Sequence, residues 1–398
     1  MGLVAGCLSP RAQAGLVRLG ARLPFAEAAA ELAYFWGIPV SKSTARRHTE
    51  AAGAAYVAVQ TAGAEAAERA GGEVAAPAGP PRQFLSADGA MVPLVGGEWA
   101  EVKTLAVGTL DPAAAGRATA LSYFSRLADA DTFTRLAVVE THRRGVPTAG
   151  AVVAVTDGSA WLQGLIDYHR PDAVRILDFP HAVEHLTSAA QAAFGVGGER
   201  AAAWIAAQAQ TLKRGDPMAV LLALLDLPVR AAPDPQGAAA ARRATLRYLA
   251  ARWEHIQYAR FLAAGDPIGD GAIESANKRV PLARLKGSGM RWERASVNPM
   301  LALRTVAAND RWAEAWPQLR AHTRALTAAR RQARRASAVP PPATPARPLP
   351  YPAPPSPRAP RRTGAIPALP PERARRPHPW SYQARLNARS LPDRRATN

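Results

Sequence analysis

The 398 residues can hold one sizeable catalytic core with a smaller domain, and their formal net charge of +19 favours a polyanionic partner, with nucleic acid as the default. The single cysteine, Cys7, excludes an internal disulfide and a zinc site built on paired cysteines of this chain, which fits a cytoplasmic protein best. Neither a run of about 18 apolar residues nor a basic start followed by an apolar core occurs, so no membrane span or secretory signal is predicted.

The first predicted elements are two helices within a helical region over residues 1–70. Apolar residues recur at helical spacing from Phe25 to Phe35, a Gly and a Pro then break the helix, and Ser41 can cap a second one. The second helix carries Arg46 and Arg47 near its start, which is typical of a helix-turn-helix whose second helix enters a DNA major groove. The alternative is a helical hairpin with a solvated basic face.

A Gly-, Pro- and Ala-rich stretch over residues 71–81 predicts a linker, and the composition changes sharply after it. Three strands are expected next, with a turn at Gly96-Gly97 between the first two, which indicates an antiparallel meander. The predicted strands are Gln83–Asp88, Glu101–Val107 and Thr119–Phe124.

Helical and strand patterns alternate in the segment that follows. The predicted elements are a helix over Asp131–Arg144, a strand over Ala151–Thr156, a helix over Ser159–His169, a strand over Ala173–Leu177 and a helix over Pro180–Phe194. A meander followed by this alternation matches a ribonuclease H-like α/β core, whose first part we assign to residues 82–196. In that arrangement the first strand and the strand at Ala151–Thr156 lie side by side.

The remaining segments complete the predicted organisation. Residues 197–262 indicate a helical insertion, which is tolerated because loop closure costs little per added residue. Residues 263–320 are expected to form the last part of the core, with an acidic helix. The segment 321–398 is a basic, Pro/Arg-rich tail that we expect to be disordered after about Ala336, since it cannot bury a core.

Three acidic residues are placed where a strand or a helix would bring them to one point. Asp88 and Asp157 each end an apolar strand and precede a glycine, and Glu274 lies on the predicted acidic helix. Carboxylates are hard oxygen ligands, and two ions shared between them can activate water or a 3′-hydroxyl while stabilising the leaving oxygen. The trio predicts a phosphoryl-transfer site for two Mg²⁺ ions, for which Mn²⁺ can substitute.

Polar and basic residues near the trio are candidates for contacts with DNA. His181 follows a predicted strand and can donate a hydrogen bond to a scissile phosphate or orient a carboxylate, although a histidine at a helix start is more often structural. Asn277 shares a helix face with Glu274 and can support it. For the basic residues a solvated face is the alternative, and for Trp292 a place in the core. The expected DNA-contacting residues here are Asn277, Lys278, Arg284, Lys286, Arg291 and Trp292.

Several motifs carry a resemblance to a known family. They are Ser86–Leu94, Gly97–Lys103, Asp157-Gly158, Asp178–Leu186, Gly271–Lys278 and Arg284–Trp292. Together they resemble insertion-sequence transposases of the ISKra group, which are DDE transposases, over about Leu8 to Trp316. The resemblance implies that Asp88, Asp157 and Glu274 form the metal-binding triad. It also aligns Asp178 and His181 with the Asp-x-x-His element of Mutator-like transposases.

The resemblance implies an enzyme that cuts DNA at the terminal inverted repeats of its own element and joins the freed 3′-hydroxyls to target DNA, as a homo-oligomer on DNA. Two alternatives stay open: a truncated remnant that only binds DNA, and a ribonuclease H-like nuclease of another role. We expect the chain to lack the family's cysteine-rich, zinc-ribbon-like segment upstream of Leu8. Asp270 also stands where the family has Ser, which adds a carboxylate near Glu274 that perturbs metal binding or caps the helix.

Overall fold

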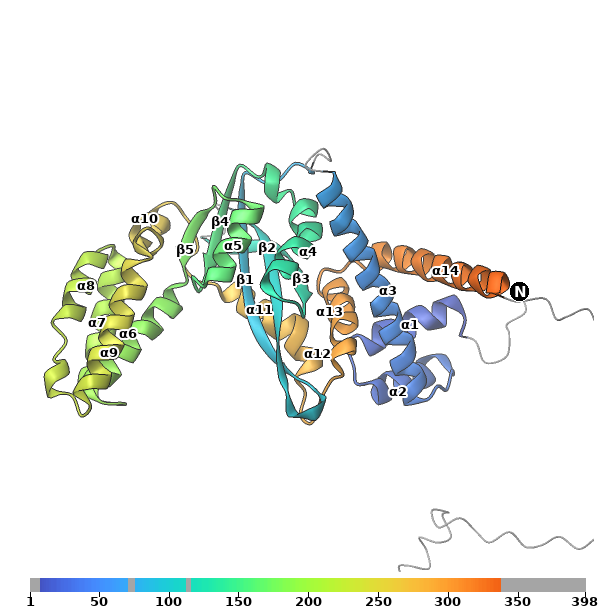
Figure 1. Ribbon diagram of the computed structural model, residues 1–398, viewed down its shortest axis with the longest axis horizontal. Helices are drawn as coiled ribbons and strands as arrows, with labels where there is room; N and C mark the ends of the chain where they lie inside the picture. The colour runs from blue at the N-terminus through green and yellow to red at the C-terminus, as the bar shows by residue number, and fades with distance from the viewer. Residues whose placement is uncertain (1–7, 71–75, 112–115, 338–398) are drawn as a thin grey trace, which may run out of the picture. The chain divides into compact units, whose positions relative to one another are not determined.

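A mixed five-stranded sheet organises the part of the chain that the computed structural model describes, residues 8–70, 76–111 and 116–337 (Figure 1). Its order is β3-β2-β1-β4-β5, with antiparallel pairing from β3 to β1 and parallel pairing from β1 to β5. The strands are β1 (Arg82–Pro93), β2 (Trp99–Leu110), β3 (Ala118–Arg126), β4 (Ala151–Thr156) and β5 (Val174–Leu177). The predicted α/β class and antiparallel meander are therefore confirmed.

Helices precede, interrupt and follow the sheet along the chain. Those up to the end of the alternating segment are α1 (Pro10–Gly20), α2 (Phe25–Trp36), α3 (Lys42–Arg69), α4 (Ala130–Arg143), α5 (Ala160–His169) and α6 (Phe179–Phe194). The later ones are α7 (Glu199–Arg214), α8 (Pro217–Leu225), α9 (Pro235–Ala250), α10 (Tyr258–Ala263), α11 (Gly271–Asn277), α12 (Ala283–Leu285), α13 (Arg294–Ala308) and α14 (Trp312–Ser337). The helices predicted for the alternating segment and the insertion are present.

Strand β4 is apolar from Ala151 to Val155 because helices cover both faces of the sheet. Val152 and Ala154 lie in a core cluster with side chains of α4 and α5, whereas Val153 and Val155 lie in a second cluster with side chains of α6 and α9. This alternation follows from the two-residue period of a strand. The two cores hold the helices on either side of β4, and β4 therefore has little freedom to move.

Parallel pairing sets β1 beside β4, as the sequence predicts. Leu85 pairs with Ala154, and continuing that register by three residues along each strand brings Asp88 opposite Asp157. Two of the three predicted metal ligands therefore come from adjacent positions. The expectation that Asp88 ends its strand is wrong, because β1 continues past it to Pro93, whereas β4 ends at Thr156, just before Asp157.

The predicted break between two helices near the N-terminus is also present. Gly37 adopts a left-handed conformation at the end of α2, and the Ser41 hydroxyl accepts a hydrogen bond from the Thr44 amide (3.1 Å) at the start of α3. Helix α3 is 28 residues long and packs against α4, α13 and α14. At its crossing with α13, a side chain at Gly53 would lie 2.2 Å from the Pro299 carbonyl oxygen, so only glycine permits this approach.

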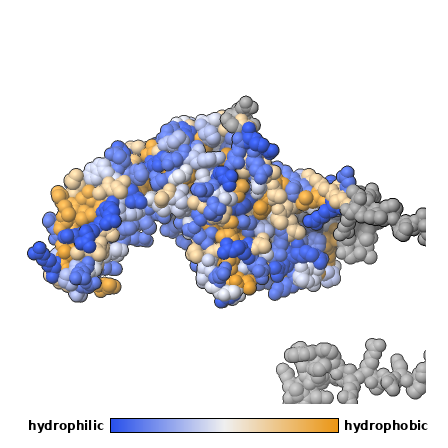
Figure 2. All heavy atoms as spheres, in the orientation of Figure 1, coloured by the Kyte–Doolittle hydropathy of each residue, from blue (hydrophilic) through white to orange (hydrophobic). Residues whose placement is uncertain are grey.

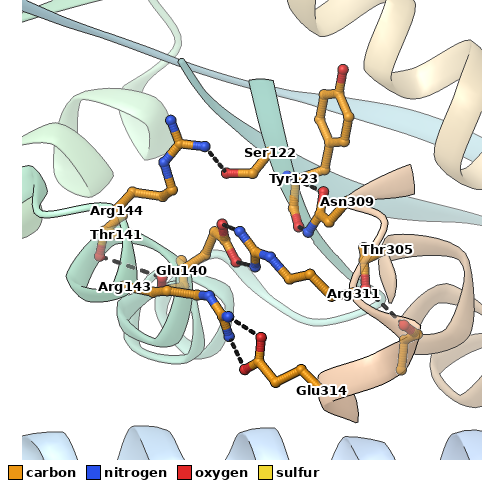
Figure 3. A network of polar contacts seen from close by, with 12 residues as sticks. Ser122, Tyr123, Glu140, Thr141, Arg143, Arg144, Thr305, Asn309, Arg311 and Glu314 are labelled. Atoms are coloured by element: carbon orange, nitrogen blue, oxygen red, sulfur yellow. Dashed lines mark hydrogen bonds and ion pairs between the residues drawn. The ribbon is translucent and has the colours of Figure 1, made fainter. Parts of the chain in front are cut away.

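Ion pairs join α4 to the junction between α13 and α14 (Figure 3). Arg311 binds both carboxylate oxygens of Glu140, at 2.6 and 2.8 Å, and Arg143 forms a two-pronged pair with Glu314. The Asn309 amide exchanges hydrogen bonds with the main chain of Tyr123 on β3, at 2.8 and 2.9 Å. This network fixes the last helices against the edge strand of the sheet.

The predicted boundaries of the linker and the tail can be compared with the structure. The described half of the predicted linker, residues 76–81, contains no helix or strand, whereas the predicted tail start at residue 321 is wrong because α14 continues to Ser337. The disorder expected after Ala336 falls almost wholly on residues 338–398, outside the described residues.

Apolar surface gathers over α8, where Met218, Leu222 and Leu225 are each more than half exposed (Figure 2). None of the described helices has the length and apolar character needed to cross a bilayer.

Burial predicts different energies for the two ion pairs of the network. The side chains of Glu140 and Arg311 are 6% and 17% exposed, against 41% and 39% for Glu314 and Arg143. We expect Glu140→Gln to lower the free energy of unfolding by about 2 kcal/mol, because it leaves a largely buried guanidinium without its counter-charge. The matched change Glu314→Gln should cost less than about 1 kcal/mol. Urea unfolding measures both, and equal losses would contradict the assignment.

Candidate functional site

Asp88 lies on β1, the strand that pairs antiparallel with β2 on one side and parallel with β4 on the other. One carboxylate oxygen accepts a hydrogen bond from the Gly89 amide (2.6 Å) and the other from the Asn277 side-chain amide (2.8 Å). Burial raises the pKa of Asp88, and the charges of Asp157 and Glu101 raise it further, while the two hydrogen bonds oppose this shift. Asp88 is thus held in place by neutral donors and lies in the field of other carboxylates.

Asp157 follows the last residue of β4 and begins a tight turn. Its side chain accepts a hydrogen bond from the Ser159 amide (2.7 Å), and its main-chain carbonyl accepts one from the Tyr248 hydroxyl. Gly158 adopts a left-handed conformation (φ 74°), which explains the glycine after the acid. The turn therefore orients Asp157 through bonds at both its side chain and its main chain.

Asp178 is the buried N-cap of α6. Its two carboxylate oxygens accept hydrogen bonds from the amides of His181 and Asp270, each at 2.9 Å. Burial raises the pKa of Asp178, and these two bonds oppose the shift. The cap fixes the segment before α11 beside the end of β5, while the His181 ring remains partly exposed and lies 3.3 Å from the carboxylate of Glu184.

Helix α11 brings the third predicted ligand to the sheet. Ile273, Ala276 and the following Val280 pack in one core cluster with side chains of β2 and β3. Glu274 is 60% exposed, and its carboxylate lies 3.5 Å from the ammonium group of Lys278. The prediction that Asn277 supports Glu274 and contacts DNA is corrected, since Asn277 is buried and donates to Asp88 instead.

Five carboxylates influence one another electrostatically at this end of the sheet. Burial raises the pKa of Asp270 to about 7, and the charges of Asp178, Asp88, Glu274 and Asp157 all contribute to the rise. Mutual repulsion of this kind is what a bound cation relieves. We refer to these five residues below as the acidic cluster.

The ligand chemistry of the acidic cluster fits a hard divalent cation. Every member supplies carboxylate oxygens, the donors that Mg²⁺ and Mn²⁺ prefer. Across the described ranges, no three His, Cys, Asp or Glu side chains are gathered as they would be around a bound ion. Glu274 is the most exposed of the predicted triad. Asp88, Asp157 and Glu274 are the residues that would hold the metal.

The predicted DNA-contacting residues divide by exposure. Arg46, Arg47, Lys278, Lys286 and Arg291 are exposed, so each can reach a phosphate. Arg46 also pairs with Glu50 at 2.9 Å on the surface of α3.

Two other predicted DNA contacts lie inside the protein. Arg284 is 2% exposed, donates to the Gly20 carbonyl (3.2 Å), and its guanidinium lies 4.7 Å from the ring centre of Phe25 and 4.9 Å from that of Trp292. Trp292 is 6% exposed and donates to the Leu285 carbonyl (3.1 Å). In this structure both residues pack α12 and the following loop against α2, and the core alternative describes Trp292 better than base stacking.

Sequence patterns did not point to two residues of the helical insertion that contact the turn at Asp157. Tyr248 on α9 and Arg252 just after it both donate to the Asp157-Gly158 turn. Burial raises the pKa of Tyr248 to about 12, so its hydroxyl remains a donor. Neither residue lies in a predicted motif, and about 90 residues separate them from the turn.

The comparison with known proteins adds no relative. No family model matches the chain, and no curated protein matches it either. The functional conclusion therefore depends on the motifs of the sequence and on the geometry of the acidic cluster.

The raised pKa of Asp270 predicts how pH affects the stability of the metal-free chain. The pKa of the Asp270 carboxyl rises from 3.8 to about 7 on folding. The folded protein therefore loses stability as pH rises through that range, because the unfolded chain gives up the proton first. We expect Asp270→Asn to remove this loss, so that the variant gains stability relative to the wild type between about pH 5 and about pH 8. Urea unfolding with a chelator present measures the difference at each pH.

Asp172 provides a control of opposite sign. A hydrogen bond from Arg170 is the main cause that lowers the pKa of Asp172. Asp172→Asn should therefore lose stability relative to the wild type only as pH rises through the acidic range near 3.8, and the difference should stay constant between about pH 5 and about pH 8. A constant difference between Asp270→Asn and the wild type across this range would contradict the assignment of Asp270.

Proposed function

We propose that the chain is a DDE transposase with a ribonuclease H-like catalytic core. The observation that carries the proposal is the placement of Asp88 on β1 and of Asp157 directly after β4, its parallel neighbour, in one electrostatic field with Glu274 of α11. Carboxylates gathered at a sheet edge suit the metal-dependent transfer of a phosphoryl group between oxygens. The substrate class proposed is DNA, with the terminal repeats of the chain's own element as the cleaved sites.

The topology supports a ribonuclease H-like core. An antiparallel meander leads into two parallel strands, β4 and β5, each followed by a helix that covers the sheet. The helical insertion, α7 to α10, lies between β5 and the acidic helix α11. This order of strands and helices matches the ribonuclease H-like layout expected from the sequence.

Other residues of the chain can hold the metal-binding carboxylates in place and bind the substrate. The Asn277 amide and the Ser159 main-chain amide hold Asp88 and Asp157, so that little reorganisation is needed when the substrate arrives. Lys278 places an exposed positive charge next to Glu274, where it can bind a phosphate. When bound at this site, Mg²⁺ supplies positive charge that favours attack on phosphorus and stabilises the leaving oxygen.

The N-terminal helices support a role in DNA recognition. A short turn joins α2 to α3, and the capped start of α3 exposes Arg46 and Arg47. A basic helix start of this kind suits a helix-turn-helix that contacts phosphates and base edges in the major groove. Membrane association is not part of the proposal.

The direct test is a cleavage and strand-transfer assay on the ends of the element that carries the gene, with Mg²⁺ or Mn²⁺ added. Cut ends and joined products support the transposase. DNA binding without cleavage would favour an inactive remnant, and cleavage that ignores the ends would favour a nuclease of another role.

The triad should act as a unit. We expect Asp88→Asn, Asp157→Asn and Glu274→Gln each to reduce cleavage to below about one thousandth of the wild-type rate, with DNA binding nearly intact. Combining two changes should add little, because one missing ligand already disables the site. Rates from single-turnover assays decide this, and substantial cleavage by Asp157→Asn would refute the triad.

Arg46 and Arg47 should contribute to DNA affinity and to preference for the element's ends. Replacing both by Ala should flatten the plot of log affinity against log salt by about 2 and reduce the preference for the ends over random DNA. The double change Arg243→Ala and Arg247→Ala removes the same charge from the exposed surface of α9 and serves as the control. Competition binding measures both, and an unchanged preference in the first variant would contradict the role of α3.

A further inference from the structure

Two residues of the helical insertion hold the turn that carries Asp157. The Tyr248 hydroxyl donates to the Asp157 carbonyl. The Arg252 guanidinium donates to the Gly158 carbonyl at 2.7 and 3.3 Å, and to the Tyr248 carbonyl at 3.0 Å. Both carbonyls of the turn are thus bound by side chains from the insertion.

The approach of Arg252 to the turn is close enough to explain the glycine at position 158. A Cβ atom at Gly158 would lie 2.4 Å from the Arg252 Nε, which is far inside normal contact. The positive φ of Gly158 independently disfavours any other residue. The close approach of Arg252 to the turn therefore requires glycine at position 158.

Aromatic contacts keep Tyr248 in place. The Arg252 guanidinium lies 3.9 Å from the Tyr248 ring centre, and the His185 ring stacks on Tyr248 with centroids 3.7 Å apart and planes inclined by 19°. His181 meets His185 edge to face, with centroids 5.3 Å apart. The stack thus runs from the Asp157-Gly158 turn to the start of α6.

We propose that Tyr248 and Arg252 are positioning residues through which the helical insertion sets the place of Asp157 in the acidic cluster. Neither touches the reacting atoms, and both act on the main chain next to a predicted metal ligand. Removing a group that orients a metal ligand typically lowers metal affinity by about 10- to 100-fold. The inference rests on the proposed function, because it assigns metal binding to Asp157.

The test uses the full chain and Mn²⁺, whose free concentration is measured by electron paramagnetic resonance. Tyr248→Phe removes only the hydroxyl and leaves the ring for His185 and Arg252 to contact. We expect it to weaken Mn²⁺ binding by about tenfold, the lower end of effects for groups that orient ligands. Arg252→Lys should also weaken binding, since a single ammonium cannot reproduce the paired bonds of a guanidinium.

Tyr258→Phe is the matched control. The Tyr258 hydroxyl donates to the Leu177 carbonyl at 3.0 Å, so its loss also removes a tyrosine bond to a strand end, but not at Asp157. Its Mn²⁺ affinity should stay within about twofold of the wild type. Equal weakening in both Tyr→Phe variants, or an unchanged affinity in Tyr248→Phe, would overturn the proposal.

Amide hydrogen exchange separates this inference from the proposed function. The Ser159 amide is bound to the Asp157 side chain, and its exchange reports on the turn without any metal. If the wild-type chain binds no Mn²⁺, the proposed function fails, and exchange alone then decides the positioning role. Faster exchange of Ser159 in Tyr248→Phe than in Tyr258→Phe supports it, and equal exchange overturns it.

Discussion

The parallel pairing of β1 with β4 is the constraint on which the rest of the structure depends. It joins an antiparallel meander to a parallel α/β unit, and it fixes the register that sets Asp88 opposite Asp157. Because both faces of β4 are buried, a shift of one residue would turn each core side chain to the wrong face. The spacing of the two acids is therefore maintained by the same packing energy that stabilises the fold.

The acidic cluster is supported almost entirely by neutral donors. Amides bind Asp88, Asp157 and Asp178, and among the contacts described the ammonium group of Lys278 approaches only the exposed Glu274. An arginine bound directly to these acids would cancel the charge that attracts a cation, whereas amides fix the geometry and leave the charge in place. The cost in the metal-free chain is seen at Asp270, whose pKa is raised mainly by burial and further by the charges of the neighbouring carboxylates.

Sequence patterns predicted the sheet well and the side-chain partners poorly. The bounds of β4 agree with the prediction because a continuous apolar run lies between Gly150 and Asp157-Gly158. Helix α14 was not predicted because its second half was assigned to the basic tail on its Arg content, although Arg and Ala are also strong helix formers. Arg284, Trp292 and Asn277 are polar or amphipathic side chains whose burial depends on contacts distant in the sequence, which no local pattern records.

The crossing of α3 with α13 fixes the distance between the basic start of α3 and the helix that packs against β3. From Lys42 to Gly53 the helix rises about 1.5 Å per residue, so its basic start stands roughly 17 Å from the crossing at a fixed angle around the helix axis. In the proposed transposase, the number of base pairs between the bases that are read and the bond that is cut would then be set by a rigid helix. One residue inserted between Arg47 and Gly53 would turn the basic start by about 100° around the axis, and in the proposed transposase the cut would then fall at a different phase of the double helix.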